Sequence, residues 1–174
     1  MPPVTAKSTA SLSDALLALD QGLSRSTSVE AGLACALEAI IDLTGATFGS
    51  GQLPDREGTL LLAVHHNMES EFCAVFARVR STQATVCGRA FAQGRSVQVE
   101  DVMCDEAFAP FRSVAERQGF RAVLSTPCIS LRGELQAMLS VHFRQPGRRP
   151  EADMVNTYLL ARRAADWLEY LRGR

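Results

Sequence analysis

Cysteine and histidine are the residue types of this sequence that could act as nucleophiles, redox groups or metal ligands. Cys87 begins a predicted short helix, where the helix dipole lowers a thiol pKa and makes the thiol more reactive. We favour a buried and unreactive thiol instead, because free cysteine is among the most buried residue types. Cys104 and Cys128 could approach each other across a loop and a strand, which leaves a redox enzyme as an alternative.

His142 could bind a ligand, a metal or the iron of a haem, since imidazole is a common metal ligand. No second ligand stands at a spacing typical of a metal site, so we expect neither metal nor haem. His65 and His66 are adjacent on a predicted strand and therefore point to opposite faces. The sequence has no Ser-His-Asp arrangement, glycine-rich phosphate loop or zinc spacing, and we expect no catalytic residue and no enzyme.

The composition restricts the class of protein further. The chain has 174 residues, of which 47% are hydrophobic, and its 18 basic and 19 acidic residues leave a net charge of −1. That length fits one domain with its own core, and the balanced charge argues against a nucleic-acid binder. Five cysteines without a CxxC motif, and the lack of a signal peptide or a long apolar run, predict a cytoplasmic protein without a membrane span.

Caps and apolar spacing predict helices at both ends of the chain. Two capping pairs mark helix starts, namely Ser11 with Asp14 and Thr27 with Glu30. We expect these helices to end near Arg25 and at Gly45, and a last helix to run from Pro150 to about Leu171. Residues 1–10 are expected to be flexible, and residues 11–174 to form a single domain.

The remaining elements predict an antiparallel sheet. Two hairpins are expected, one over residues 47–66 and one over 121–144 with its turn at Arg132-Gly133. Val97 and Val99 belong to a further strand, and residues 101–120 form a long connection with a short helix at 111–118. Two further segments are predicted to be helical, Glu69–Arg80 and Cys87–Gln93. The fold class is therefore α+β, with a central antiparallel sheet of five to six strands.

The last strand has two unlike faces. Its aliphatic face is predicted to pack on the terminal helices and consists of Leu135, Ala137, Leu139, Val141 and Phe143. Its mixed face is predicted to border a partly polar pocket and consists of Gln136, Met138, Ser140 and His142. Residues 101–120 could cover this pocket as a lid that carries Phe108 and Phe111.

The last helix carries two apolar stripes, where a peripheral helix needs one. The first is Met154, Tyr158, Ala161, Ala165 and Leu168, and the second is Leu160, Ala164, Trp167 and Leu171. The second stripe predicts either a deeply packed helix or the seam of a homodimer.

The stretch from residue 87 to residue 143 resembles a GAF domain of the kind found in bacterial sensor kinases and related regulators. The matching pieces, in chain order, are Cys87-Gly88-Arg89-Ala90 with Gly94, Val97-Gln98-Val99-Glu100-Asp101, Asp105 and Phe108, Gly119-Phe120-Arg121-Ala122-Val123-Leu124-Ser125-Thr126-Pro127, and Leu139-Ser140-Val141-His142-Phe143 with Pro146. A weaker pattern extends over about residues 12–172. The resemblance implies terminal helices on one face of the sheet and a ligand pocket with a lid on the other.

Two departures narrow what the resemblance implies about the ligand. Members that bind cyclic nucleotides carry Asn-Lys/Arg and Phe-x-x-x-Asp-Glu, whereas the Asp-Glu pair here is Asp105-Glu106 and position 101 is an aspartate. Phytochrome-like members carry Asp-Ile-Pro in the lid, where this chain has Asp105-Glu106-Ala107. We therefore expect neither a cyclic nucleotide nor a bilin, and the small molecule stays unidentified.

The predicted ligand site combines the mixed face of the sheet with the lid. Its members are Val99, Asp101, Phe108, Phe111, Phe120, Arg121, Ser125, Met138, Ser140 and His142. Asp101 and Asp105 could orient a polar ligand, but we favour a role as caps of short lid helices. Arg112 and Arg121 could pair with an anionic ligand, but we favour arginines that are solvated or pair with a surface carboxylate.

The resemblance implies a small-molecule-binding sensory domain without catalysis of its own. Such a domain would work in signal transduction, as in two-component systems, and would pass its signal through the terminal helices of a homodimer to an output domain or partner kinase. We keep two alternatives, a ligand-free dimerisation module and a thiol-based enzyme similar to the methionine sulfoxide reductases of this fold.

Overall fold

The computed structural model describes residues 10–173, so the expectation of a flexible segment at residues 1–10 lies almost wholly outside the described residues. Thirteen elements follow one another along the chain. They are α1 (Leu12–Arg25), α2 (Val29–Thr44), β1 (Phe48–Pro54), β2 (Thr59–His66), α3 (Ser70–Val75), β3 (Arg78–Arg80), α4 (Val86–Gln93), β4 (Val97–Val99), the 3-10 helix η1 (Ala109–Phe111), α5 (Arg112–Gln118), β5 (Ala122–Ile129), β6 (Leu135–Phe143) and α6 (Glu151–Arg172).

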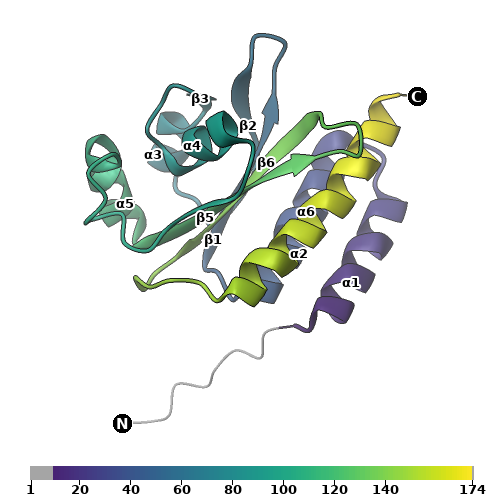
Figure 1. The fold of residues 1–174 in the computed structure, drawn as a ribbon, viewed down its shortest axis with the longest axis horizontal. Coiled ribbons are helices and arrows are strands. Elements are labelled where there is room, and N and C mark those ends of the chain that lie inside the picture. The colour runs from purple at the N-terminus through teal and green to yellow at the C-terminus, as the bar shows by residue number, and fades with distance from the viewer. Residues whose placement is uncertain (1–9, 174) are drawn as a thin grey trace.

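The strands form one six-stranded sheet in the order β3-β2-β1-β6-β5-β4, with antiparallel pairing between neighbours. This confirms the predicted α+β fold and the predicted sheet. Helices α1, α2 and α6 lie on one side of the sheet, and α3, α4 and α5 lie on the other (Figure 1). The two ends of the chain thus build one layer, and the middle of the chain builds the other.

Local capping explains where the first helices begin and end. The Ser11 hydroxyl accepts a hydrogen bond of 3.1 Å from the Asp14 amide, as predicted for the first helix. Helix α2 ends at Gly45, whose φ of 68° is left-handed. The predicted cap at Thr27 is wrong by one residue, because the Ser28 hydroxyl accepts from the Ala31 amide and starts α2 there.

The single helix predicted over Glu69–Arg80 is wrong in its second half. Helix α3 ends at Val75, and residues 78–80 form β3, in which Val79 lies opposite Leu60 of β2. Val79 is buried between two exposed arginines, which is the alternation of an edge strand. Pairing with β2 has overridden the local helical pattern, as tertiary context often does for short segments.

A β-bulge alters the predicted faces of β6 near its start. Cys128 lies opposite Ala137, but Ile129 lies opposite Leu135, so Gln136 is the extra residue. Gln136 points to the helix side, where its Oε1 accepts a 2.6 Å hydrogen bond from Arg172 Nη1. Leu135 packs on the opposite face of the sheet, which carries α3, α4 and α5 and is called the lid side below. The predicted faces of Leu135 and Gln136 are therefore wrong, while those of residues 137–143 are confirmed.

The core between the sheet and the terminal helices is tightly packed. Both predicted stripes of α6 contribute to it, because Leu160, Ala161, Ala164, Ala165 and Leu168 are all 0% exposed. Trp167, from the second stripe, lies against Gly32 of α2 so closely that a Cβ there would be 2.1 Å from a ring carbon. Much of the second stripe is thus used inside the domain. The exposed apolar residues of α6 are instead Val155, Tyr158, Leu159 and Tyr170.

Candidate ligand-binding site

A small cavity lies on the face of the sheet opposite the terminal helices, beneath α3, α4 and the lid, which we define as residues 101–120. Its volume, measured as the space open to the centre of a water molecule, is about 20 Å³. That is room for about one water molecule. The cavity is lined by Ser50, Gln52, Phe72, Phe76, Val86, Cys87, Phe108, Phe120, Val123, Ser125, Ser140 and His142.

About half of the predicted ligand-site residues line this cavity. They are Phe108, Phe120, Ser125, Ser140 and His142, joined by the candidate thiol Cys87. Val99 and Met138 are buried in the surrounding core, and Phe111 packs on that core from the lid. Asp101 and Arg121 do not line the cavity but pair with each other at the base of the lid.

Sequence reasoning missed part of the wall. Ser50 and Gln52 come from β1, where they alternate with two glycines, and this alternation was a signal that one face of the strand is polar. Phe72 and Phe76 come from the segment around α3 and are spaced by four residues, which places both on one face of a helical turn. The aromatic rings of the lid and of this segment meet directly, since the Phe76 and Phe111 centroids are 5.6 Å apart.

A row of three serines crosses the floor of the cavity. Ser50 of β1 pairs with Ser140 of β6, which in turn pairs with Ser125 of β5. The hydroxyls of Ser125 and Ser140 are 2.7 Å apart and hydrogen-bonded to each other. Next to the row, Gln52 Nε2 donates a 3.3 Å hydrogen bond to the carbonyl of Phe76. Its Oε1 is buried and has no hydrogen-bond partner among the described residues.

His142 is held between aromatic rings at the cavity wall. Its ring lies edge-on to Phe72 at 5.4 Å and to Phe120 at 4.7 Å between centroids. Burial lowers the pKa of His142 to about 3, and a hydrogen bond with the backbone of Phe48 opposes that shift. The imidazole is therefore neutral at pH 7. Its Nδ1 is buried and has no hydrogen-bond partner within the described chain.

Cys104 and Cys128 do not form the redox pair that was kept as an alternative. Cys104 is exposed on the lid, whereas Cys128 is buried in the core on the helix side of the sheet, so the sheet separates them. Burial raises the pKa of Cys128 to about 12 and also raises the pKa of Cys87. The favoured interpretation of Cys87 as a buried thiol agrees with this, because desolvation outweighs the hydrogen bonds that favour the thiolate.

The base of the lid is fixed by an aspartate and an arginine. Arg121 donates from both Nε and Nη2 to the Asp101 carboxylate, and this hydrogen bonding lowers the pKa of Asp101 to about 2. Asp101 Oδ1 also accepts from the Met103 amide at 3.0 Å. The favoured interpretation of these residues, capping for Asp101 and pairing with a carboxylate for Arg121, agrees with these contacts.

Three further arginines hold the rest of the lid. Arg112 donates to the carbonyls of Val102 and Asp105, at 3.3 and 2.9 Å. Arg89 of α4 donates from Nη1 to Asp105 Oδ2 at 3.0 Å. Arg117 forms an ion pair with Glu71 of α3. These contacts are part-buried or exposed, so the lid is held by polar interactions that compete with water.

Other places on the molecule offer less chemistry. A larger hollow of about 810 Å³ lies beside the C-terminal end of α6, but it is an open depression lined by arginines and carboxylates. Within residues 10–173, no three His, Cys, Asp or Glu side chains gather in a way that could hold a metal ion. The described helices include none that is long and apolar enough to cross a membrane.

Several solved structures share this fold. The GAF domain of an Acinetobacter phosphoenolpyruvate-protein phosphotransferase has a TM-score of 0.75 at 18% identity, over 93% of this chain and 95% of that one. The free methionine-R-sulfoxide reductase from Neisseria meningitidis has a TM-score of 0.75 at 21% identity, over 99% of both chains. A domain of a putative two-component sensor histidine kinase protein from Sinorhizobium meliloti 1021 has a TM-score of 0.70 at 17% identity, over 84% and 94%.

These identities are low enough that the structural likeness establishes the fold alone. No curated protein sequence gives a significant match. A family model described as a GAF domain matches residues 26–169, which is most of the chain and spans the sheet, the lid and the greater part of α6. The chain therefore belongs to the GAF domain family.

Proposed function

We propose that this GAF domain is a sensor that binds a small apolar molecule in the lid-side cavity and reports its presence through the terminal helices. One observation carries the proposal. Two buried polar atoms at the cavity, the acceptor Gln52 Oε1 and the ring nitrogen His142 Nδ1, have no partner among the described residues. Such groups are rare in folded proteins, and a bound molecule that forms hydrogen bonds would satisfy them.

The walls indicate what kind of molecule would fit. Four phenylalanine rings supply apolar surface, and the neutral His142 and the serine row supply hydrogen bonds without a net charge. Sites of this kind, apolar with a few placed polar groups, are typical of small-molecule pockets. We propose an aromatic or compact apolar ligand that carries at least one hydrogen-bond donor.

The small size of the cavity means that binding requires movement. With space for about one water, the closed form holds no larger ligand. The lid is attached by buried apolar residues such as Val102, Phe108 and Ala115 and by arginine contacts near the surface. Its outward movement therefore exposes apolar surface, which a ligand with an apolar body would cover, and breaks ion pairs that water can replace. A ligand that binds the open form better would shift the lid equilibrium.

A route to the terminal helices runs through β5 and β6. Ser125 and Ser140 face the cavity, while their neighbours Leu124 and Leu139 lie in the core that the sheet shares with α2 and α6 on the other face. A shift of these strands would therefore reach both layers. We propose that the output is another domain or a partner protein in the cytoplasm, such as a kinase.

Thermal unfolding with matched compounds tests the proposal. We expect 2-phenylethanol, with a ring and a hydroxyl donor, to raise the Tm by several degrees, and propylbenzene, with a methyl group in place of the hydroxyl, to raise it less. The substitution His142→Leu should remove the difference between the two compounds, and His65→Leu, at an exposed histidine, should keep it. If neither compound, nor a wider metabolite panel, stabilises the protein, the sensor proposal fails.

A dimerisation module is the second candidate, and the nearly filled cavity favours it. Val155, Tyr158 and Leu159 are 50%, 48% and 40% exposed at helical spacing on α6, as a seam between two copies would require. Sedimentation would detect a dimer that Leu159→Glu converts to a monomer. A protein that stays monomeric at high micromolar concentration would exclude this candidate.

Reduction of methionine sulfoxide is the third possibility, because the reductase from Neisseria meningitidis has this fold. The cavity thiol here, Cys87, has a raised pKa and is separated from Cys128 by the sheet. We therefore expect no reduction of free methionine sulfoxide with a thiol reductant. Turnover that Cys87→Ser abolishes would overturn this expectation.

A further inference from the structure

Arg89 is the arginine of α4 that faces the lid, and it is only partly satisfied. Its Nη1 donates to Asp105 Oδ2 at 3.0 Å, and the side chain is 24% exposed. Its Nε and Nη2 are fully buried, yet neither has a hydrogen-bond partner among the described residues. Two buried guanidinium nitrogens without an acceptor are costly, because these charged donors have lost water and gained no partner within the described chain.

Two other arginines around the lid show which hydrogen bonds the Nε and Nη2 atoms of a guanidinium usually form. Arg117 donates from Nε and Nη2 to both oxygens of Glu71, and Arg121 donates from Nε and Nη2 to both oxygens of Asp101. This edge of the guanidinium matches the two oxygens of a carboxylate. In Arg89 the same edge is buried, and the neighbouring carboxylate of Asp105 is bound at the other nitrogen.

We propose that the Nε/Nη2 edge of Arg89 receives the carboxylate of a small organic acid. The inference deepens the proposed function and rests on it, because the same lid covers both places. Val86 and Cys87, on the preceding turn of α4, line the cavity, and so does Phe108, three residues after Asp105. The ligand would thus be an acid with a carboxylate directed to Arg89, an apolar body directed to the phenylalanine rings, and on that body the hydrogen-bond donor that Gln52 Oε1 requires. Phenylacetate has no such donor and therefore probes the carboxylate site alone.

Asp105 would then act as the internal competitor of the ligand. Its Oδ1 accepts from the Phe108 amide at 2.9 Å, so the ion pair between Asp105 and Arg89 holds Phe108 over the cavity. The Nε/Nη2 edge is enclosed in this closed form, and a carboxylate reaches it when the lid moves outward. An acid bound there weakens the hold of Arg89 on Asp105, which links binding of an anion to the position of the lid.

Phenylacetate and phenylacetamide test the inference, since they have nearly the same shape and differ in charge. Binding is measured by calorimetry and by the ¹⁵N–¹H signals of the arginine Nε groups, with the Arg89 signal assigned from its loss in Arg89→Lys. We expect phenylacetate to bind roughly tenfold to a hundredfold more tightly than phenylacetamide and to shift the Arg89 signal.

Three variants test which side chains cause the preference for phenylacetate over phenylacetamide. Arg89→Lys keeps the charge but lacks the bidentate edge, and it should lose most of the preference for phenylacetate. Asp105→Asn keeps an oxygen for the Phe108 amide and removes the competing charge, so it should bind phenylacetate more tightly. Arg117→Gln removes an arginine whose edge already holds Glu71, and it should leave the preference unchanged.

The outcomes separate this inference from the proposed function. If phenylacetamide and phenylacetate bind equally, or if Arg89→Lys keeps the preference, the carboxylate site is wrong while the cavity proposal stands. If phenylacetate binds without shifting the Arg89 signal, the carboxylate lies elsewhere and the site is likewise wrong. If neither compound binds, both the carboxylate site and a cavity for aromatic ligands are excluded.

Discussion

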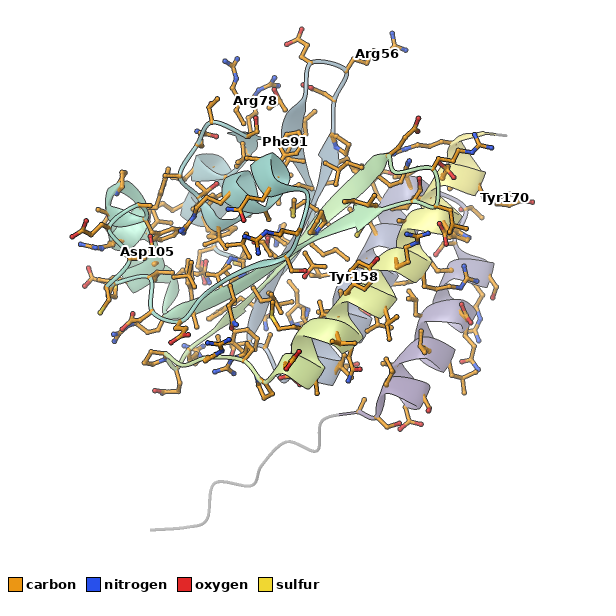
Figure 2. All side chains as sticks on the ribbon, viewed as in Figure 1. Arg56, Arg78, Phe91, Asp105, Tyr158 and Tyr170 are labelled. Atoms are coloured by element: carbon orange, nitrogen blue, oxygen red, sulfur yellow. The ribbon has the colours of Figure 1, made fainter. Side chains whose placement is uncertain are left out.

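The two faces of the sheet carry different kinds of side chain. On the helix side, small and aliphatic residues dominate, and six alanines of α1, α2 and α6 are buried there, namely Ala15, Ala36, Ala39, Ala161, Ala164 and Ala165. On the lid side, phenylalanine rings gather around serines, a glutamine and a histidine, and arginines form ion pairs that hold the lid. Asp105 of the lid and Tyr158 of α6 mark the opposite sides in Figure 2.

This difference in composition indicates which face tolerates local opening and substitution while the fold is kept. Alanine and glycine contacts let helices approach closely, and such packing tolerates little change in volume. The lid side keeps a cavity, surface ion pairs and buried polar atoms that have no partner within residues 10–173, which are features of low local stability and of binding sites. We therefore regard the helix side as the scaffold and the lid side as the variable part.

The largest effect is expected where a helix contact has no spare space. Gly32→Ala would place a methyl group 2.1 Å from the Trp167 ring, and we expect a loss of about 3 kcal/mol in the free energy of unfolding. Alanine is otherwise the better helix former by about 1 kcal/mol, so a loss would come from the clash.

Urea unfolding measures the effect, and the double variant Gly32→Ala with Trp167→Phe provides the control. The smaller ring should recover part of the loss, as expected for residues in contact. Equal stability of wild type and Gly32→Ala would show that the helix side is less rigid than we describe.

The second effect comes from His142 on the lid side. Its pKa is about 3 in the folded protein and about 6.5 when unfolded, so the unfolded chain takes up the proton first as the pH falls. Stability is therefore lost from about pH 6.5 downward, and we expect it to be about 2 kcal/mol lower at pH 5 than at pH 7.

Variants assign this pH dependence. Unfolding at pH 5 and pH 7 should differ much less in His142→Leu, and His65→Gln should behave as the wild type. Asp101, with its pKa of about 2, loses its contribution only below about pH 4 and does not disturb this range. A wild-type protein equally stable at pH 5 and pH 7 would contradict a buried neutral His142.

A matched pair of valines compares the faces directly. Val123 lines the cavity, and Val141 is 1% exposed in the helix-side core. One added methylene in Val141→Ile should cost about 1–2 kcal/mol through overpacking, whereas Val123→Ile should change stability by less than about 0.5 kcal/mol. Equal costs by calorimetry would mean that the lid side is packed as densely as the other.

The smallest effect on global stability is expected at Arg112, which holds two lid carbonyls. Arg112→Gln should speed amide hydrogen exchange severalfold around Val102 and Phe108, and should leave α2 and α6 unchanged. Exchange that accelerates equally in α2 would indicate that the lid and the scaffold open as one unit.

The sequence was sufficient to predict what short-range chemistry determines. The Ser11 cap, the end of α2 at Gly45 and the turn at Gly133, with its φ of 82°, all depend on neighbouring residues and are confirmed. The edge strand at residues 78–80 and the bulge at Gln136 depend on partners far along the chain, and both were missed.

The residues of the cavity divide in the same way, into those that a local pattern predicts and those that distant parts of the chain bring together. Ser140 and His142 were predicted from the alternation of one strand, but Gln52 and Phe72 reach the same wall only through the order of the sheet and the path of α3. The ion pair between Arg89 and Asp105 also joins α4 to the lid across 16 residues, and no local pattern indicates it.

Hydrogen exchange with and without 2-phenylethanol tests the central claim, that the lid side binds and the helix side is the scaffold, most directly. We predict that the compound slows exchange severalfold in residues 101–120 and in α4, while α1 and α2 keep their rates. Unchanged exchange in the lid at saturating compound, or equal slowing in α1, α2 and the lid, would contradict the account.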